Sequence, residues 1–228
     1  MYESLLKIPI DDFYLTGNII MPVRSESLVI FSHGSGSNRF SPRNKMVARE
    51  LRKAGYGTLL FDFMGEHEEE DYEKRFEIDT LSQRLVSVTN WIQSQDKFKD
   101  HDLAYFGAGM GATKALNAAA NLGDKIKAIA CRGAKTDHIK SSVIKKIKSP
   151  TLLIAGKEDK STIGHNKKFL NQLDCPNKLI TIAKAGHLME KPHMMQEVAD
   201  VTIEWFDNYL RKGTLKPDLE YDTPDPEY

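Results

Sequence analysis

The sequence predicts a three-layer α/β fold in which a mostly parallel sheet carries helices on both faces. Short apolar runs alternate along the chain with stretches of helical spacing, which is typical of this class. The runs are apolar at almost every position, as expected for strands buried on both faces of a parallel sheet. A length of 228 residues suits one domain with a sizeable core.

The first element is an edge segment. Residues 5–22 alternate loosely between apolar and polar side chains and predict one or two antiparallel strands, with a turn at Thr16, Gly17 and Asn18. Six apolar runs then predict the strands of the parallel sheet. They cover residues 28–32, 58–63, 103–106, 126–130, 151–155 and 178–183.

Five stretches between and after these runs predict helices. Ser41 and Pro42 form a cap and first turn for the first helix, and Gly55 follows it as a stop signal. The Ala-rich third helix ends at Gly123. The helices cover residues 44–54, 79–94, 110–122, 162–173 and 190–210.

The C-terminal stretch has a different composition from the rest of the chain. Residues 213–228 are polar and contain three prolines, so we expect a mobile tail after a domain that spans residues 1–212. The tail holds five acids and one lysine, a net charge of −4, which leaves +4 on the domain.

Composition excludes several classes of function. The 32 basic and 32 acidic residues balance, so no global field attracts nucleic acid or an anionic membrane. Cys131 and Cys175 are too few for a disulfide framework and are not spaced as a metal pair. The N-terminus lacks a signal-peptide pattern, and no apolar run could span a bilayer. We expect a cytoplasmic protein with no cofactor, metal or nucleic-acid partner.

Candidate site residues follow the predicted strands, because ligands of open parallel sheets bind beyond the carboxyl ends of the strands. The first buried strand leads into His33 and Gly34, and residues 103–106 lead into a glycine-rich turn, residues 107–111. Asp159 and His187 follow the last two strands. Asp159 would orient the imidazole of His187 as an acid–base pair. The alternatives are a helix-capping carboxylate and a polar residue in a glycine-rich turn.

This set, in this order, resembles the α/β-hydrolase superfamily over residues 28–210, and within it the dienelactone-hydrolase-like branch. The separations fit as well, with 50 residues from Gly109 to Asp159 and 28 from Asp159 to His187. The resemblance implies an α/β-hydrolase fold, carboxylic-ester hydrolysis, and an oxyanion hole formed by the backbone N–H groups of Ser35 and Met110. Residues 33–44, HGSGSNRFSPRN, are similar to a subgroup found fused to phosphoribosyltransferase domains, which implies a phosphoribosyltransferase as a possible partner.

The sequence departs from the family pattern at its centre. The family elbow is Gly-x-Ser-x-Gly, or carries Cys, whereas Gly109 stands at the nucleophile position and has no side chain. The departure predicts a pseudoenzyme in which ester hydrolysis is weak or lost. Two other interpretations of nearby residues stay open. The glycines could bind a phosphate, although the Lys-Ser/Thr of a P-loop is missing, and Cys131 beside Arg132 could act as a thiolate.

Basic residues near the same sheet edge suggest an anionic ligand. His33, Arg39, Arg43 and Arg132 are the candidate ligand-binding residues, since guanidinium groups suit carboxylate and phosphate oxygens. Ion pairing with an acidic segment is the alternative, with Arg75 and Arg84 as further partners. That segment is either a lid or a solvated charge run, and His67 within it has no partner of metal-ligand spacing. Its acids are Glu66, Glu68, Glu69, Glu70, Asp71 and Glu73.

Three functional hypotheses follow. The first is a dienelactone-hydrolase-like protein that retains Asp159 and His187, lacks a nucleophile, and binds a small anionic ligand. The second is an active hydrolase that uses water or an unusual nucleophile. The third is a non-enzymatic interaction module whose contact surface is the acidic segment and the tail.

Overall fold

The computed structural model describes residues 1–65, 68 and 73–211. Within this part of the chain, eight strands form one sheet in the order β1-β2-β4-β3-β5-β6-β7-β8. β1 and β2 pair antiparallel with each other and β2 with β4, whereas all other neighbours are parallel. The strands are β1 (Tyr2–Ile10), β2 (Phe13–Met21), β3 (Ser27–Ser32), β4 (Gly57–Phe61), β5 (Asp102–Ala108), β6 (Ile126–Arg132), β7 (Thr151–Gly156) and β8 (Asn177–Ile182).

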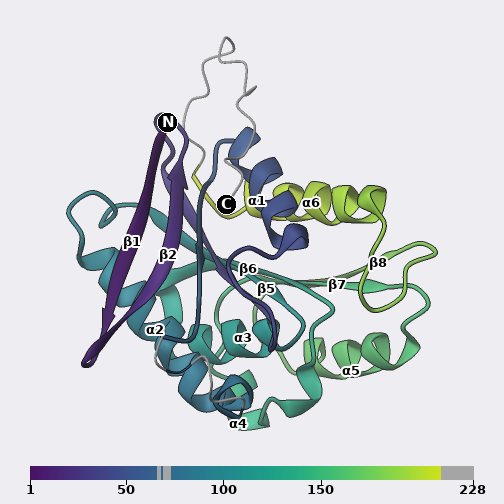
Figure 1. The fold of residues 1–228 in the computed structure, drawn as a ribbon. Coiled ribbons are helices and arrows are strands. Elements are labelled where there is room, and N and C mark those ends of the chain that lie inside the picture. The colour runs from purple at the N-terminus through teal and green to yellow at the C-terminus, as the bar shows by residue number, and fades with distance from the viewer. Residues whose placement is uncertain (66–67, 69–72, 212–228) are drawn as a thin grey trace.

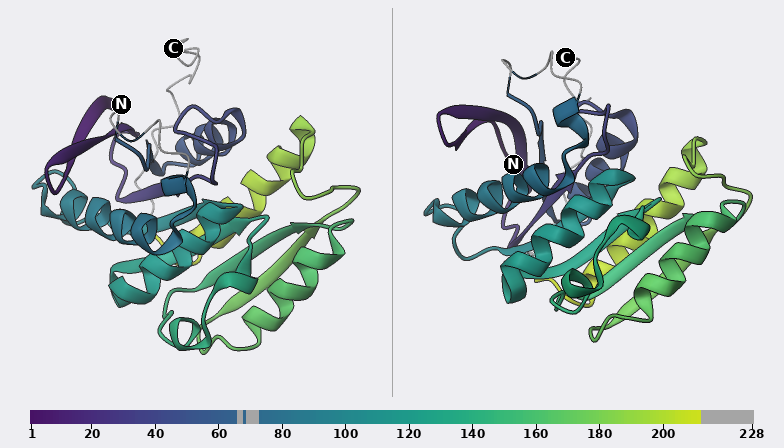
Figure 2. Two further views of the ribbon diagram at one scale, coloured as in Figure 1. Left: turned by 60° about the horizontal axis from the view of Figure 1, so that its bottom comes forward. Right: turned by 90° about the horizontal axis from the view of Figure 1, so that it is seen from below.

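Helices cover both faces of the sheet, which gives the predicted three layers (Figures 1 and 2). Helices α1 and α6 pack together in one core cluster, and α2, α3 and α5 contribute to the other. The helices are α1 (Pro42–Lys53), α2 (Ile78–Ser94), α3 (Met110–Leu122), α4 (Ser141–Ile144), α5 (Lys160–Leu170) and α6 (Pro192–Asp207). None of the helices in the described residues has the length and apolarity needed to cross a membrane.

The central strands are buried on both faces, as their apolar sequences require. Along β3, Leu28 and Ile30 enter one core cluster while Val29 and Phe31 enter the other. Every residue of β3, β4 and β7 is buried. Because successive side chains point to opposite faces, an apolar residue is needed at almost every position.

The edge segment forms two strands, but its predicted turn is wrong. The hairpin turns at Asp11 and Asp12, and Asp11 adopts a positive φ of 48°. Gly17 lies inside β2 instead, paired with Phe61 of β4. A Cβ on Gly17 would stand only 3.1 Å from the Cβ of Phe61. This glycine therefore permits close packing between strands and does not make a turn.

Local capping signals fix several helix ends. Helix α3 spans the predicted residues between Gly109 and Gly123, and the hydroxyl of Ser41 caps α1. Helix α5 begins two residues earlier than predicted because the carboxylate of Asp159 caps it, and α6 is shorter than predicted. Helix α4 and the 3₁₀ helix Glu73–Phe76 were not predicted.

The parallel strands bring their following loops to one edge of the sheet. The backbone N–H of Gly109, after β5, donates to the carbonyl of Arg132 at 2.9 Å, and that of Gly133, after β6, donates to Ile154 at 2.8 Å. The N–H of Lys157, after β7, donates to Ile182 at 2.9 Å. These backbone bonds hold the candidate site loops in fixed relative positions.

Candidate active site

The turn between β5 and α3 is held by three glycines, each for a different reason. A Cβ on Gly111 would collide with the carbonyl oxygen of Ser32, and a Cβ on Gly107 would lie 2.6 Å from the Cα of Ala112. Gly109 has open space above its Cα, with no atom within 4 Å of a built Cβ. Its backbone is unusual, with φ 58° and ψ −123°, a conformation that costs an L-residue strain. Packing alone therefore explains the outer glycines but not Gly109.

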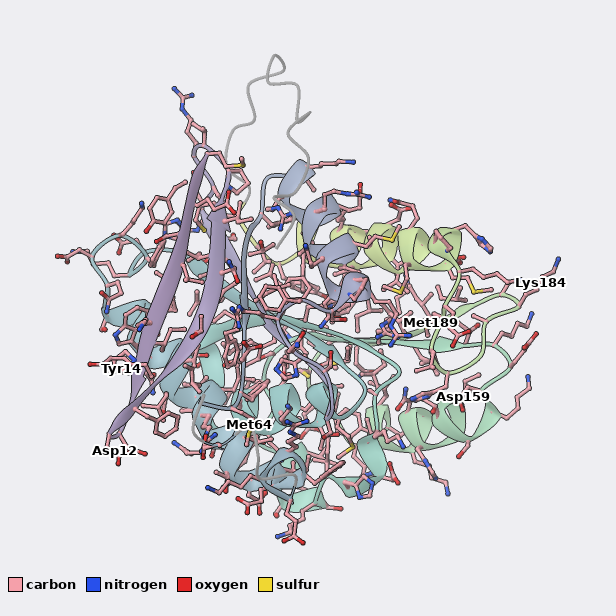
Figure 3. All side chains as sticks on the ribbon, viewed as in Figure 1. Asp12, Tyr14, Met64, Asp159, Lys184 and Met189 are labelled. Atoms are coloured by element: carbon pink, nitrogen blue, oxygen red, sulfur yellow. The ribbon has the colours of Figure 1, made fainter. Side chains whose placement is uncertain are left out.

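Asp159 and His187 meet as predicted. Nδ1 of His187 lies 2.7 Å from Oδ2 of Asp159, and the other oxygen of Asp159 accepts the backbone N–H of Thr162 at 3.1 Å. Asp159 therefore both caps α5 and orients the imidazole. Burial opposes ionisation of Asp159, but hydrogen bonds from Thr162 and His187 outweigh it and lower the pKa of the carboxyl. Figure 3 labels Asp159 at the start of α5.

The imidazole of His187 lies over the end of β6 and is partly open to solvent. A Cβ on Gly133 would stand 3.5 Å from Cε1 of His187 and 3.8 Å from Nε2. The side chain of His187 is 38% exposed, compared with 14% for Asp159. Nε2 of His187 is the nitrogen that Asp159 leaves available, so the pair is arranged to receive a proton.

Arg132 and Arg43 supply positive charge on the His187 side of the site. Arg132 is buried and donates from one guanidinium nitrogen to the carbonyl of Leu188 at 3.0 Å. Its Nε is buried without a hydrogen-bond partner. Burial, and then the charge of Arg43, lowers the pKa of Arg132 to about 10, so the group stays charged at neutral pH.

A cavity of about 240 Å³ lies on the other side of the turn that follows β3. His33, Ser35 and Arg39 line it, together with Asp62 and Phe63 after β4, and it also includes Arg75, Leu81 and Lys114. Met64 is a further lining residue and is labelled in Figure 3. Arg43, Arg132, Asp159 and His187 are absent from its lining. The structure therefore divides the four predicted ligand-binding residues between two places.

Arg39 is held in a structural ion pair. Its guanidinium pairs with the carboxylate of Asp62, and its Nε donates to Asn18 at 3.0 Å. The same group lies 4.1 Å from the centroid of the Phe40 ring. Both oxygens of Asp62 are engaged, since the backbone N–H of Arg39 also donates to this carboxylate. Arg39 therefore forms an ion pair, but its partner is Asp62 and not an acid of the predicted acidic segment.

The turn after β3 packs against the elbow, where the predicted oxyanion-hole residues lie. A Cβ on Gly34 would be 3.2 Å from the carbonyl of Ala108 and 3.9 Å from the backbone nitrogen of Met110. Ser35 follows Gly34, and its hydroxyl donates to the carbonyl of Arg75 at 2.9 Å. The hydroxyl of Ser35 is thus used for structure, and the role of its backbone N–H stays a prediction.

Neither cysteine is suited to be a replacement nucleophile. Cys131 is fully buried, and burial raises the pKa of its thiol to about 12. The cation at Arg132 does not offset this, so the structure favours a buried structural cysteine over the alternative of a Cys131 thiolate. Cys175 is half-buried and its sulfur donates to the carbonyl of Ser149 at 3.2 Å.

The acidic segment is described only at two positions, Glu68 and Glu73; His67 and the other acids lie outside the described residues, as does the predicted tail. Glu68 is buried and receives two bonds from the guanidinium of Arg84, at 2.6 and 2.7 Å. It also accepts the backbone N–H of Gly65 at 3.1 Å. Arg84 therefore serves the ion pair and not a ligand. In the described residues, no three His, Cys, Asp or Glu side chains are grouped as metal ligands would be.

Lys114 is the polar group that the sequence analysis missed. It is the only charged residue of α3, is 1% exposed, and lies one helical turn beyond Met110. Its Nζ is 3.5 Å from the centroid of the Phe63 ring. A single lysine in an otherwise small and apolar helix, four residues after the elbow, was the available signal.

Comparison with known proteins agrees with this geometry. The sequence pattern of the alpha/beta hydrolase domain family matches residues 25–204. The crystal structure of a dienelactone hydrolase from Anabaena variabilis superimposes with a TM-score of 0.88 at 37% identity, covering 92% of this chain and 99% of that one. Est1E from Butyrivibrio proteoclasticus, seen with ferulic acid, shares the fold at 18% identity, with a TM-score of 0.76 and coverage of 90% and 98%.

Two Mycobacterium tuberculosis proteins that carry the name phosphoribosyl transferase are 35% identical over 196 residues. The match covers 86% of this chain but only 44% of theirs, so the chain spans less than half the length of these relatives. The family match, the sheet order and the dienelactone hydrolase structure agree with one another. The chain belongs to the α/β-hydrolase family, in its dienelactone-hydrolase-like branch.

Proposed function

We propose that this chain binds a small anionic ligand in its α/β-hydrolase site and does not hydrolyse esters through an acyl-enzyme. One observation carries the proposal: Gly109 occupies the strained turn between β5 and α3, and the space above its Cα is open. A covalent mechanism needs a nucleophilic atom in that space, next to a base. Gly109 offers none.

The acid–base pair by itself does not restore the missing step. Asp159 and His187 are in contact, but the base has no side chain at position 109 from which to take a proton. Cys131 keeps its proton because burial raises its pKa. Activation of a water by His187 is the second candidate, favoured by its contact with Asp159. It would be slow because it forgoes the covalent intermediate.

The arginines next to His187 support an anion as the ligand. Arg132 is buried, remains charged, and has a buried Nε without a hydrogen-bond partner. Arg43 lies close enough for its charge to disfavour protonation of Arg132. Arg43 and Arg132 repel each other, and a carboxylate or phosphate between them would relieve that repulsion. The anion would also accept a hydrogen bond from the Nε–H of Arg132.

Restoring a nucleophile tests whether the missing side chain at Gly109 is what prevents acyl-enzyme formation. Gly109→Ser should gain hydrolysis of p-nitrophenyl acetate with a burst of acyl-enzyme, measured by absorbance and intact mass. Gly123→Ser is the matched control, because Gly123 at the other end of α3 has φ 57°, ψ −128° and equally open space. It should suffer similar backbone strain and gain nothing. A stoichiometric burst from the unmodified protein would contradict the proposal.

Ligand binding is tested with defined anions. Acetate, benzoate and inorganic phosphate are titrated while the melting temperature is followed. We expect at least one of these anions to raise the melting temperature of the unmodified protein. Its affinity for the Arg43→Gln variant should be about tenfold lower. Arg49→Gln is the control, since Arg49 pairs with the neighbouring Glu50 on α1. Equal shifts in both variants would show non-specific screening.

The relatives suggest where such a domain works. The chain matches 44% of the length of proteins named as phosphoribosyl transferases, and we propose a phosphoribosyltransferase as its partner. Co-purification of this chain with such an enzyme supports the partner, and its absence at high protein concentration counts against it.

A further inference from the structure

The cavity beside the turn after β3 contains two buried polar groups that the proposed function does not use. Lys114 comes from α3 and His33 from the loop after β3, and both line the cavity. Both are buried, with exposed fractions of 1% for Lys114 and 7% for His33. Buried polar groups normally have a hydrogen-bond partner, so this pair needs an explanation.

Lys114 lacks the acid that a buried ammonium usually has. Within residues 1–65, 68 and 73–211, no carboxylate pairs with it, and its Nζ lies against the ring of Phe63. The other charged groups that line the same cavity are Arg39 and Asp62, which pair with each other, and Arg75. Burial lowers the pKa of Lys114 to about 7, which favours the neutral amine far more than for an exposed lysine.

His33 lines this cavity and is held as a neutral imidazole in one tautomer. Its Nδ1 lies 3.0 Å from the carbonyl oxygen of Gly34, which can only accept, so Nδ1 carries the proton. Nε2 then has the free lone pair, and among the described residues it is buried without a partner. Burial, and then the charge of Lys114, lowers the pKa of His33 to about 3. The ring is fixed by edge contact with Phe63, at 5.0 Å between centroids.

We propose that Lys114 is a reactive amine that condenses with the carbonyl of a small aldehyde or ketone in this cavity to form an imine. The volume of about 240 Å³ is below the range of roughly 300–1,000 Å³ that holds drug-sized ligands, so it selects a small molecule. A neutral lysine in an apolar surrounding is the usual amine nucleophile of proteins. The site does not involve Gly109, Asp159 or His187, so it stands independently of the proposed function.

The reaction balances without an oxidant or a reductant. The lone pair of Nζ forms a bond to the carbonyl carbon, and the π electrons move to the oxygen, which takes a proton from Nζ to give a carbinolamine. Loss of the hydroxyl with the second proton as water leaves the C=N bond. In the proposed reaction, Nε2 of His33 accepts a hydrogen bond from the hydroxyl of the carbinolamine and so stabilises this intermediate.

A bound anion is the competing use of Lys114, and His33 argues against it. An anion next to Lys114 would face the lone pair of a neutral imidazole, whereas a hydroxyl or a carbinolamine would find an acceptor there. The two uses also differ in outcome, because only the carbonyl compound becomes covalently attached after reduction.

The test is reductive trapping with a defined carbonyl compound. The full chain is incubated with propanal or glyoxylate and sodium cyanoborohydride at pH 7.5, and labelled lysines are mapped by peptide mass spectrometry. We expect Lys114 to be labelled at least about tenfold faster than Lys127, an exposed lysine on β6, because burial lowers the pKa of Lys114. The rate at Lys114 should level off just above pH 7.

Variants complete the experiment. Lys114→Met and Lys114→Arg should lose the fast label, Lys127→Met should keep it, and His33→Gln should slow it several-fold. Labelling of Lys114 that is no faster than that of Lys127 in the unmodified protein overturns the proposal, and this comparison does not depend on any variant folding. Stabilisation by propionate without any trapped adduct also overturns it, in favour of an anion site at Lys114.

Discussion

His187 and His33 follow two strands of the same sheet edge, yet their surroundings are opposite. His187 is partly exposed and shares a hydrogen bond with Asp159. His33 is buried, has no acid partner among the described residues, and lies near Lys114. An acid partner favours the protonated imidazole that a base must form, and burial beside a cation prevents it. A position at the carboxyl edge of the sheet is therefore not enough to assign a role to a histidine. The ionisable group next to the imidazole decides whether it can act as a base.

The largest expected effect concerns Lys114. In the unfolded chain this lysine keeps its proton up to about pH 10.5, but in the folded chain it releases it near pH 7. The unfolded state therefore binds more protons between these values, and stability rises with pH across this window. The shift corresponds to roughly 5 kcal/mol, which Lys114→Met should recover below pH 7 and progressively less towards pH 10.

The measurement is urea denaturation of both proteins at several pH values. Lys127→Met serves as the control and should show no such pH-dependent gain. A constant difference between Lys114→Met and the unmodified protein would mean that folding does not lower the pKa of Lys114. Lys114 would then be a permanent cation beside His33, and the neutral amine proposed above would be ruled out.

The next effect concerns His33 in acid. Its pKa falls from 6.5 to about 3 on folding, so only the unfolded chain takes up the proton between these values, and stability falls as the pH falls. His33→Gln should remove roughly 3 kcal/mol of this loss by pH 4. Acid unfolding followed by circular dichroism checks it, with His193→Gln on the exposed start of α6 as the comparison. Identical acid midpoints would show that His33 is not the sensitive group.

The smallest effect concerns Asp159 of the Asp159–His187 pair. Asp159→Ala removes the cap of α5 and should cost about 1 kcal/mol, while Asp159→Asn keeps an acceptor for the Thr162 N–H and should lose much less. The free energy of unfolding separates the two variants. Should both cost the same, the charge on Asp159 and not the cap would be what stabilises the fold.

Much of the fold could be predicted because its signals are local. Helix α3 matches its predicted span since glycines stand at both ends, and β3 is recognisable because both faces are buried. The turn predicted at Gly17 is wrong because glycine is favoured both in turns and where two strands pack closely. Only the partner strand shows which applies, and Phe61 lies 44 residues further along the chain.

The candidate site also has residues that could be predicted from the sequence and residues that could not. Asp159 and His187 could be found by their order after late strands, and the structure brings them into contact. The burial of Lys114 could not be found, because a lone lysine on a helix normally points to solvent, and here Phe63 from the loop after β4 packs against it. Likewise Arg39 and Arg132 both follow strand ends, but only Arg39 meets a carboxylate, that of Asp62.

The open space above Gly109 has a consequence for catalyst design. A Cβ added there would meet no neighbouring atom within 4 Å, and the positive φ adds backbone strain. Serine, cysteine and aspartate would then present an alcohol, a thiol and a carboxylate to the same Asp159–His187 pair. Position 109 could therefore be used to compare the intrinsic reactivity of different nucleophiles while the surrounding site stays the same.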